Sequence, residues 1–163
     1  GEYFIRIKSI EEYIKSRFIY DATLNEQKDK RARINMRRDN IEEKLRSIIL
    51  FSLQAKYGKK AKEQLISLAE KTTTDTTQKI KMLNAPSLKK TIEELYFSQI
   101  KAIIDKDWKN YANIFPDKSK FEAYMDILSR SRKVGAHVRS ISQDEEILYG
   151  IAFEYFENIL EEY

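Results

Sequence analysis

The sequence predicts an all-α fold, an up-and-down helical bundle with additional N-terminal helices, on three observations. The 163 residues include only 4 Gly and 2 Pro, whereas an average protein carries roughly 12% of these two residues. Apolar residues recur at steps of three and four, which is the period of a helix. Pairs typical of helix N-termini recur along the chain. We therefore expect one helical domain over residues 1–163 and exclude sandwiches and barrels, which need a turn every roughly 8 to 12 residues.

Helix starts are predicted where a capping residue precedes a Glu by three positions, because the two side chains then bond the free amides at a helix N-terminus. Four pairs have this spacing: Ser9 with Glu12, Asp39 with Glu42, Thr91 with Glu94, and Ser142 with Glu145. The third pair is expected inside a helix, since Pro86 and Ser87 already offer a start upstream. Asp117, directly after Pro116, gives one more start.

From these starts we expect the following helices, with a short additional one around Trp108: 9–22, 40–57, 60–71, 87–105, 118–133 and 143–162. Apolar stripes support them, as with Ile41, Leu45 and Ile48 in the second. Segment 72–77, Thr-Thr-Thr-Asp-Thr-Thr, has no apolar residue and is expected to be a surface loop. Residues 3–7 are apolar but too few to assign, so a strand, a linker and a helix extension all remain open.

The last predicted helix is apolar over more than a quarter of its circumference. Its apolar residues form two neighbouring stripes, one of Leu148, Ala152, Tyr155 and Ile159, the other of Tyr149, Phe153, Phe156 and Leu160. Such a helix must be covered from two sides. It is therefore either a central helix of the bundle or a helix shared with a dimer interface.

Composition excludes several classes of protein. The chain has no cysteine, which removes disulfides, thiolate nucleophiles and zinc knuckles. The longest apolar run, residues 48–51, is far shorter than the roughly 20 residues of a membrane span, so we expect a soluble, cytoplasmic protein. No His, Asp or Glu cluster has the spacing of metal ligands, and no cofactor motif is present. Because the chain opens on Gly1 and not on Met, we expect it to be an excised piece of a longer protein.

Charge is distributed unevenly along the chain. Residues 28–38 carry six basic residues and one acidic residue, whereas residues 144–163 carry seven acidic residues and no Lys or Arg. Such asymmetry predicts oriented contacts. The basic stretch has two interpretations: an element that follows a phosphate backbone, or a solvated loop and helix entry. Base stacking is not expected there, because no aromatic residue lies between Glu26 and Leu50.

The predicted helix from Lys118 contains the strongest candidate site. Its apolar stripe of Phe121, Tyr124, Met125 and Leu128 is followed at the next position by Arg132, a charge where a hydrophobic residue is due. Five residues later comes His137, the single histidine, just after Gly135, which is a candidate helix end. The flanking cations are Arg130, Lys133 and Arg139. The segment is either a positive pocket around a titratable imidazole or a structural arrangement in which Arg132 caps the helix and His137 bonds a turn.

The stretch 95–141 resembles the C-terminal half of a HEPN domain, an all-helical family that includes many RNases. In these domains an Arg, four to six residues and a His follow the penultimate helix, and here the segment reads Arg-Lys-Val-Gly-Ala-His over 132–137. The resemblance makes residues 87–163 the HEPN-like core and residues 1–86 additional N-terminal helices. It departs from active members at Lys133, where a small polar residue is usual.

The resemblance implies a homodimeric, metal-independent endoribonuclease, the effector of a toxin or phage-defence system, with a possible antitoxin as partner. His137 would take the proton from a ribose 2′-OH, Arg132 would stabilise the phosphoryl charge, and Arg130, Lys133 and Arg139 would bind phosphate. Because one His cannot easily serve as both base and acid, the second proton is expected from His137 of another copy. The alternative is a non-catalytic HEPN module for dimerisation or for RNA or nucleotide binding within a larger protein that includes an ATPase. A third option is a helical bundle unrelated to nucleic acid.

Overall fold

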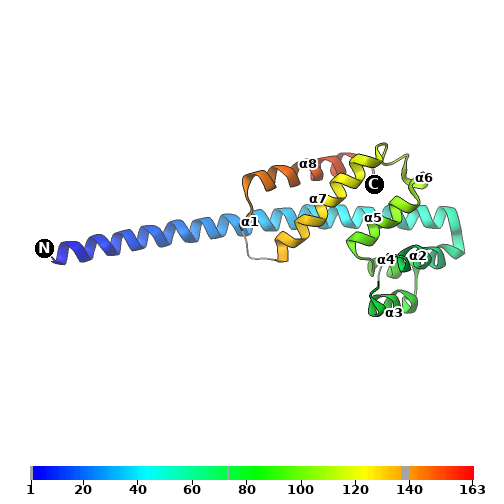
Figure 1. The fold of residues 1–163 in the computed structure, drawn as a ribbon, viewed down its shortest axis with the longest axis horizontal. Coiled ribbons are helices and arrows are strands. Elements are labelled where there is room, and N and C mark those ends of the chain that lie inside the picture. Colours follow the sequence, from blue (N-terminus) through cyan, green and yellow to red (C-terminus); the bar gives the residue numbers. More distant parts are fainter. Residues whose placement is uncertain (1, 73, 137–139) are drawn as a thin grey trace.

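The chain is built on one long helix, α1 (Glu2–Tyr57, 56 residues), in the computed structural model. The structure describes residues 2–72, 74–136 and 140–163, with side chains except those of 2–8 and 132–136. Most of the other helices pack against the C-terminal half of α1, and its N-terminal part projects away from them (Figure 1). We call residues 2–26 the arm. The described residues form helices and connecting turns with no strand among them, which confirms the all-α prediction.

The continuity of α1 corrects the predicted helices at 9–22 and 40–57, which are parts of one element. Ser9 and Asp39 lie inside this helix and start none. Between residues 2 and 57 there is no Gly or Pro. The helix therefore continues through the polar residues around position 30, because no helix-breaking residue interrupts it there. Residues 3–7 are part of the same helix, which settles their assignment. The helix stops where Gly58 adopts a left-handed φ of 52°.

A group of short helices follows: η1 (Gly58–Lys60), α2 (Ala61–Glu70), α3 (Thr76–Asn84), α4 (Leu88–Glu93), α5 (Phe97–Lys106) and α6 (Trp108–Tyr111). The predicted helix at 60–71 and the short one around Trp108 are confirmed. Helix α3 was not predicted. It begins inside the expected loop 72–77 because the Asp75 carboxylate accepts a hydrogen bond from the Gln78 amide and caps it.

The predicted helix at 87–105 is two helices, α4 and α5, separated by residues 94–96. Ser87 caps α4 as expected, accepting from the Lys90 amide at 3.2 Å. The interruption has a tertiary cause. The Gln78 side chain donates to the Glu94 carbonyl at 2.7 Å and the Arg46 guanidinium to the Leu95 carbonyl at 2.9 Å, so these carbonyls are bonded from other helices.

The chain ends with α7 (Lys118–Ala136) and α8 (Gln143–Ile159). Both predicted caps are confirmed. The Asp117 carboxylate accepts from the Lys120 amide at 3.0 Å, and Ser142 and Glu145 exchange hydrogen bonds of 3.1 and 3.2 Å. Helix α7 extends past its predicted end, so Gly135 lies inside the helix and does not terminate it.

Aromatic rings fill the core where α7 and α8 meet the segment after α6. Phe115 lies 4.8 Å from Phe121 and 6.2 Å from Phe156 between ring centroids. Trp108 packs on Phe121 at 5.5 Å, and Tyr111 is fully buried. Burial raises the pKa of the Tyr111 hydroxyl. These rings are packing residues and are not available as platforms for bases.

Helix α8 lies at the side of the bundle, on α7 and α1. Its buried residues are Tyr149, Ala152, Phe153 and Phe156, and Leu160, directly after its end, is buried as well. The stripe of Tyr149, Phe153, Phe156 and Leu160 is thus buried. In the other stripe Ala152 is buried and Tyr155 and Ile159 pack against the core, whereas Leu148 is exposed, as are Ile147 and Ile151 outside both stripes. α8 is not a central helix, because its outer face has no cover within the described chain. Among the described residues, no helix combines the length and the apolar character that crossing a bilayer requires.

Candidate functional site

The predicted site lies at the C-terminal end of α7. Arg130 is exposed near that end. Arg132 and Lys133 belong to the last turns of α7, but their side chains are outside the described set, and His137 and Arg139 lie outside the described residues altogether. The structure therefore shows where α7, which contains Arg132 and Lys133, lies, and where residues 140–142 lead into α8.

The end of α7 is set against the bundle by its apolar stripe. Phe121, Met125 and Leu128 are fully buried, and the next buried position is Ser131, whose hydroxyl donates to the Leu128 carbonyl at 2.7 Å. A small residue with its own hydrogen bond lets the helix approach its neighbours closely without leaving an unpaired polar group. The buried face of α7 therefore continues at Ser131 and not at position 132, where the spacing in the sequence predicts the next residue of the stripe.

Gln27 of α1 holds the segment that returns from the site. Its side-chain oxygen accepts the Ile141 amide at 2.7 Å, and its side-chain nitrogen donates to the Ile141 carbonyl at 3.5 Å. Ile141 itself is buried, and Ser142 next to it caps α8. The start of α8 is therefore positioned beside this part of α1. Sequence reasoning missed Gln27, since its partner lies 114 positions away and no local pattern marks it.

The basic stretch 28–38 lies within α1, which corrects its interpretation as a loop and helix entry. The Lys30 ammonium is 3.1 Å from both Glu26 and Glu146, and the Arg33 guanidinium is 3.8 Å from Glu146. Hydrogen bonding to Glu146, then to Glu26, raises the pKa of Lys30.

Arg37 makes the strongest link between the basic stretch and α8. It bonds the Glu157 carboxylate through two nitrogens, at 2.8 and 2.7 Å, and its guanidinium lies 4.8 Å from the centre of the Phe153 ring. The hydrogen bond to Glu157 raises the pKa of Arg37. The charge asymmetry of the sequence thus produces contacts within the chain. Lys30, Arg33 and Arg37 are paired with carboxylates, and binding a phosphate backbone would require them to leave these partners.

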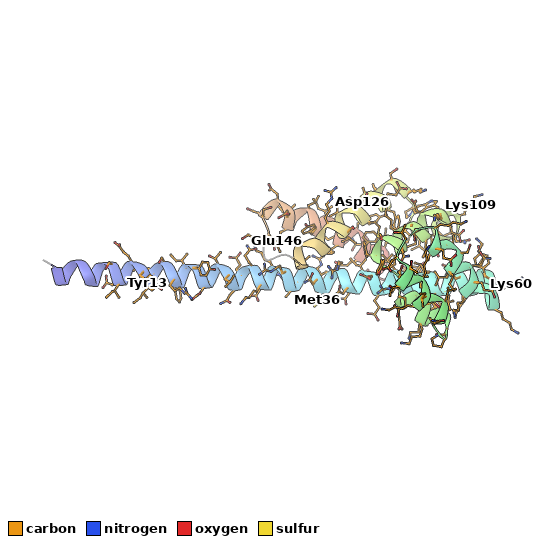
Figure 2. All side chains as sticks on the ribbon, turned by 60° about the horizontal axis from the view of Figure 1, so that its bottom comes forward. Tyr13, Met36, Lys60, Lys109, Asp126 and Glu146 are labelled. Atoms are coloured by element: carbon orange, nitrogen blue, oxygen red, sulfur yellow. The ribbon has the colours of Figure 1, made fainter. Side chains whose placement is uncertain are left out.

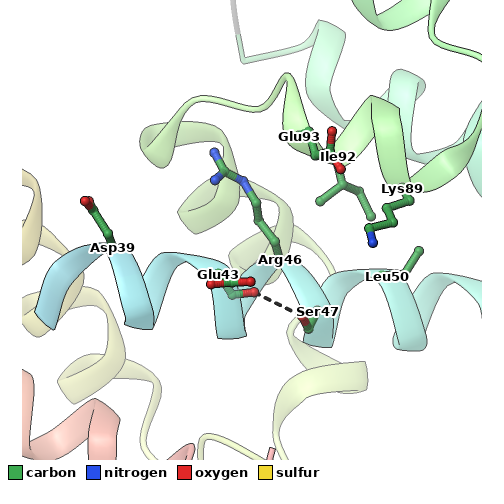
Figure 3. A pocket seen from close by; sticks show the side chains of 8 residues that line it. All are labelled: Asp39, Glu43, Arg46, Ser47, Leu50, Lys89, Ile92 and Glu93. Carbon is green, nitrogen blue, oxygen red and sulfur yellow. Dashed lines mark hydrogen bonds between the residues drawn. The ribbon is translucent and has the colours of Figure 1, made fainter. Parts of the chain in front are cut away.

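A groove of about 410 Å³ lies between α1 and α4 (Figure 3). Its lining is Asp39, Glu43, Arg46, Ser47, Leu50, Lys89, Ile92 and Glu93. Three carboxylates face one guanidinium and one ammonium, so the groove is no anion site. Arg46 is held in place by Glu42 at 2.6 Å and by the Leu95 carbonyl.

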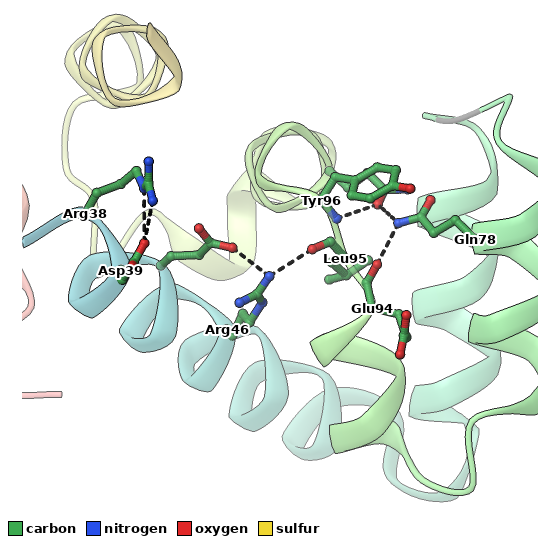
Figure 4. A network of polar contacts seen from close by, with 9 residues as sticks. Arg38, Asp39, Arg46, Gln78, Glu94, Leu95 and Tyr96 are labelled. Atoms are coloured by element: carbon green, nitrogen blue, oxygen red, sulfur yellow. Dashed lines mark hydrogen bonds and ion pairs between the residues drawn. The ribbon is translucent and has the colours of Figure 1, made fainter. Parts of the chain in front are cut away.

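A polar network joins the short helices beyond this groove (Figure 4). Gln78 and Gln99 are buried and bond each other, and the Gln99 side-chain oxygen also accepts the Tyr96 amide at 2.8 Å. The Tyr96 hydroxyl donates to the Asp75 carboxylate at 2.7 Å. That hydrogen bond, with one from the Gln78 amide, lowers the pKa of Asp75. This network fixes the helices and contains no group placed for catalysis.

Within the described part of the chain, no group of three or more His, Asp or Glu side chains could hold a metal ion. Comparison of the chain with protein-family models, with curated proteins and with solved structures finds no match.

Proposed function

We propose that the chain is a HEPN-like, metal-independent endoribonuclease that acts as a homodimer, the effector of a toxin or phage-defence system. One observation carries the proposal. Helix α7 is the penultimate helix of the described chain, Arg132 belongs to its last turns, and His137 comes five residues after Arg132 in the sequence. HEPN RNases have their Arg and His at this place.

The charges of the segment support an anionic ligand. No acidic residue occurs between Asp126 and Asp144, whereas four Lys or Arg and the single His do. In the basic stretch of α1, by comparison, Lys30 and Arg37 are paired with carboxylates of α8. The end of α7 is therefore the better place for a phosphate, and the contribution of these cations to binding falls as salt rises.

In the proposed reaction His137 accepts the proton of a ribose 2′-OH, whose oxygen attacks the adjacent phosphorus. Arg132 stabilises the negative charge that builds on the phosphoryl oxygens. His137 of a second copy donates a proton to the leaving 5′-oxygen, and the products are a cyclic phosphate and a 5′-hydroxyl. Two histidines acting as base and acid give a bell-shaped dependence of the rate on pH around the ordinary imidazole pKa of about 6.5.

Incubation of the full chain with labelled RNA in EDTA tests this activity. Cleavage is expected to survive EDTA and to fall by roughly 10²- to 10⁴-fold in His137→Ala, the range that a proton-transfer group contributes. Arg132→Ala is expected to lose cleavage as well. Arg33→Ala, in an exposed Arg outside α7, is the matched control and should keep it. Undiminished cleavage in His137→Ala would refute the proposal.

Lys133 favours a second candidate, a non-catalytic module that binds RNA, because active HEPN members usually have a small polar residue at this position. In that case RNA stays intact but binds in a salt-sensitive manner. Arg130→Ala and Lys133→Ala would then weaken binding, whereas Arg33→Ala would not. Intact RNA with no binding at all would leave neither candidate standing.

A further inference from the structure

The arm of α1 presents an apolar face that nothing in the described chain covers. Every residue from 9 to 23 is exposed, and Figure 2 shows Tyr13 far from the packed helices. The large apolar side chains on this face are between 56% and 75% exposed: Ile10, Tyr13, Ile14, Phe18 and Tyr20. A single helix without packing is marginally stable in water, so an amphipathic helix of this length needs a partner.

The residues at the centre of this face follow a heptad spacing. Ile10, Ile14, Arg17, Asp21 and Leu24 are separated by alternating steps of four and three residues, the spacing of the contact positions of a two-helix coiled coil. Phe18 and Tyr20 flank the central pair. Arg17 and Asp21 therefore occupy core positions, although they are charged. The Nε of Arg17 lies 3.7 Å from an Asp21 carboxylate oxygen within the same helix, and both side chains are exposed.

These charges indicate both the partner and its direction. In a parallel pair of identical arms, Arg17 would meet Arg17 of the other copy and Asp21 would meet Asp21, and like charges in facing positions are destabilising. In an antiparallel pair whose two-fold axis passes beside residue 19, Arg17 meets Asp21 of the other copy, and Asp21 meets Arg17. We propose that the arm pairs in an antiparallel coiled coil with the arm of a second copy of this chain.

The same register pairs apolar residues. It brings Ile14 opposite Leu24 of the second copy in two symmetric layers, and it places the Phe18 and Tyr20 rings of both copies around the central ion pairs. Ile10 meets Lys28, whose methylene groups cover it while the ammonium reaches water. The exposed parts of the aromatic and aliphatic side chains amount to roughly 600 Å² per arm. Complete burial of both faces would therefore remove roughly 1,200 Å², about the lower bound of a stable interface.

This pairing is a different contact from the shared site of the proposed RNase. Among the described residues, the first bond from α1 to the rest of the bundle is made by Gln27, eight residues beyond the axis. At a rise of 1.5 Å per residue the two bundles begin roughly 24 Å apart, which is too far for their α7 ends to meet on one phosphodiester. The arm proposal therefore stands or fails independently of RNA cleavage.

Sedimentation of the full chain at micromolar concentration tests the interface with two isoleucines of one helix. Ile14 lies on the proposed contact face, whereas Ile19, which is 65% exposed, lies outside the heptad contact positions. Ile14→Lys is expected to halve the sedimenting mass, and Ile19→Lys to leave it unchanged. Arg17→Asp should also halve the mass, and adding Asp21→Arg should restore it. A wild-type chain that sediments as a monomer would overturn the proposal. Binding of the arm to vesicles of anionic lipid would not rescue it, because the partner would then be a lipid surface and not a second copy.

Disulfide crosslinking tests the direction, and the absence of cysteine from the chain leaves no background. A mixture of the Ile14→Cys and Leu24→Cys variants is expected to form the mixed disulfide, while either variant alone forms little. Efficient crosslinking of Ile14→Cys to itself would indicate a parallel pair and overturn the antiparallel proposal. The same experiment on Arg132→Ala should give an unchanged result, because the arm contact does not involve the RNase site.

Discussion

Single polar side chains decide how the connecting segments of this protein are placed. Gln27 fixes the return from α7 to α8 by bonding both the amide and the carbonyl of Ile141. Arg46 and Gln78 bond carbonyls at the junction of α4 and α5. In each case a side chain from one helix satisfies backbone groups that the ends of another leave free.

Gln27→Ala is expected to reduce the free energy of unfolding by about 1–2 kcal/mol, because it leaves the amide of buried Ile141 without its acceptor. Urea unfolding followed by the fluorescence of Trp108, the single tryptophan, measures this loss. Asn25→Ala, in an exposed side chain two positions away, is the matched control and should change little. Equal losses in both variants would show that the contact with Ile141 contributes nothing.

Asp75 is expected to make folding sensitive to acid. Hydrogen bonds from the Tyr96 hydroxyl and the Gln78 amide lower its pKa in the folded chain. Its stabilisation is therefore present above the ordinary carboxyl pKa of about 3.9 and is lost as the pH falls through the lower folded value.

Asp75→Asn keeps a capping side chain but removes this titration. Its unfolding free energy should vary less with pH below about pH 4 than that of the wild type. Asp29→Asn, an exposed site on α1, should follow the wild-type profile. A profile of Asp75→Asn that matches the wild type would contradict the assignment.

At the scale of elements, α1 has two parts with different support. Its C-terminal half contacts α2, α4, α5, α7 and α8, so its helical conformation is coupled to the core. The arm has no such contacts within the described chain, and its helix depends on propensity and on the proposed second copy. A uniform helix thus has non-uniform stability along its length.

Two exposed alanines of α1 test this difference. Ala32→Gly, between Lys30 and the buried Ile34, should reduce the unfolding free energy of the bundle by about 1 kcal/mol, the cost of Gly in a helix interior. Ala22→Gly, in the arm, should leave the Trp108 transition in place and lower only the helical circular dichroism. If both variants shifted the Trp108 transition equally, the arm would be coupled to the core.

At the scale of the whole molecule, opposite charges from distant parts of the sequence are joined. Glu146 and Glu157 of α8 meet Lys30 and Arg37 of α1, and these partly exposed pairs orient α8 more than they stabilise it. The proposed arm pair and the proposed shared RNase site are separate contacts. If both form, the assembly exceeds a dimer, and Ile14→Lys should reduce it to the unit that shares the site without abolishing cleavage of RNA.

Local signals in the sequence predicted helices well where the cause is local. The caps at Ser87, Asp117 and Ser142 hold, because a side chain three positions from an amide can act without tertiary help. The same kind of signal failed at Ser9 and Asp39, since capping residues also occur inside long helices. For the candidate site, the sequence singled out Arg132 and His137 as a pair. The structure adds that Arg132 belongs to the last turns of α7, whereas His137 lies outside the described residues.

The sequence by itself determined that the chain is helical, because scarce Gly and Pro and a period near 3.6 leave no other way to bury its apolar residues. The structure showed that α1 runs unbroken through the basic stretch, and only the tertiary structure decided that α4 and α5 separate. It also decided that one face of α8 stays open. The physical reason is that the break between α4 and α5 and the position of α8 depend on bonds between residues far apart in the chain, such as Arg46 with the Leu95 carbonyl and Arg37 with Glu157. Local spacing in the sequence does not identify such partners.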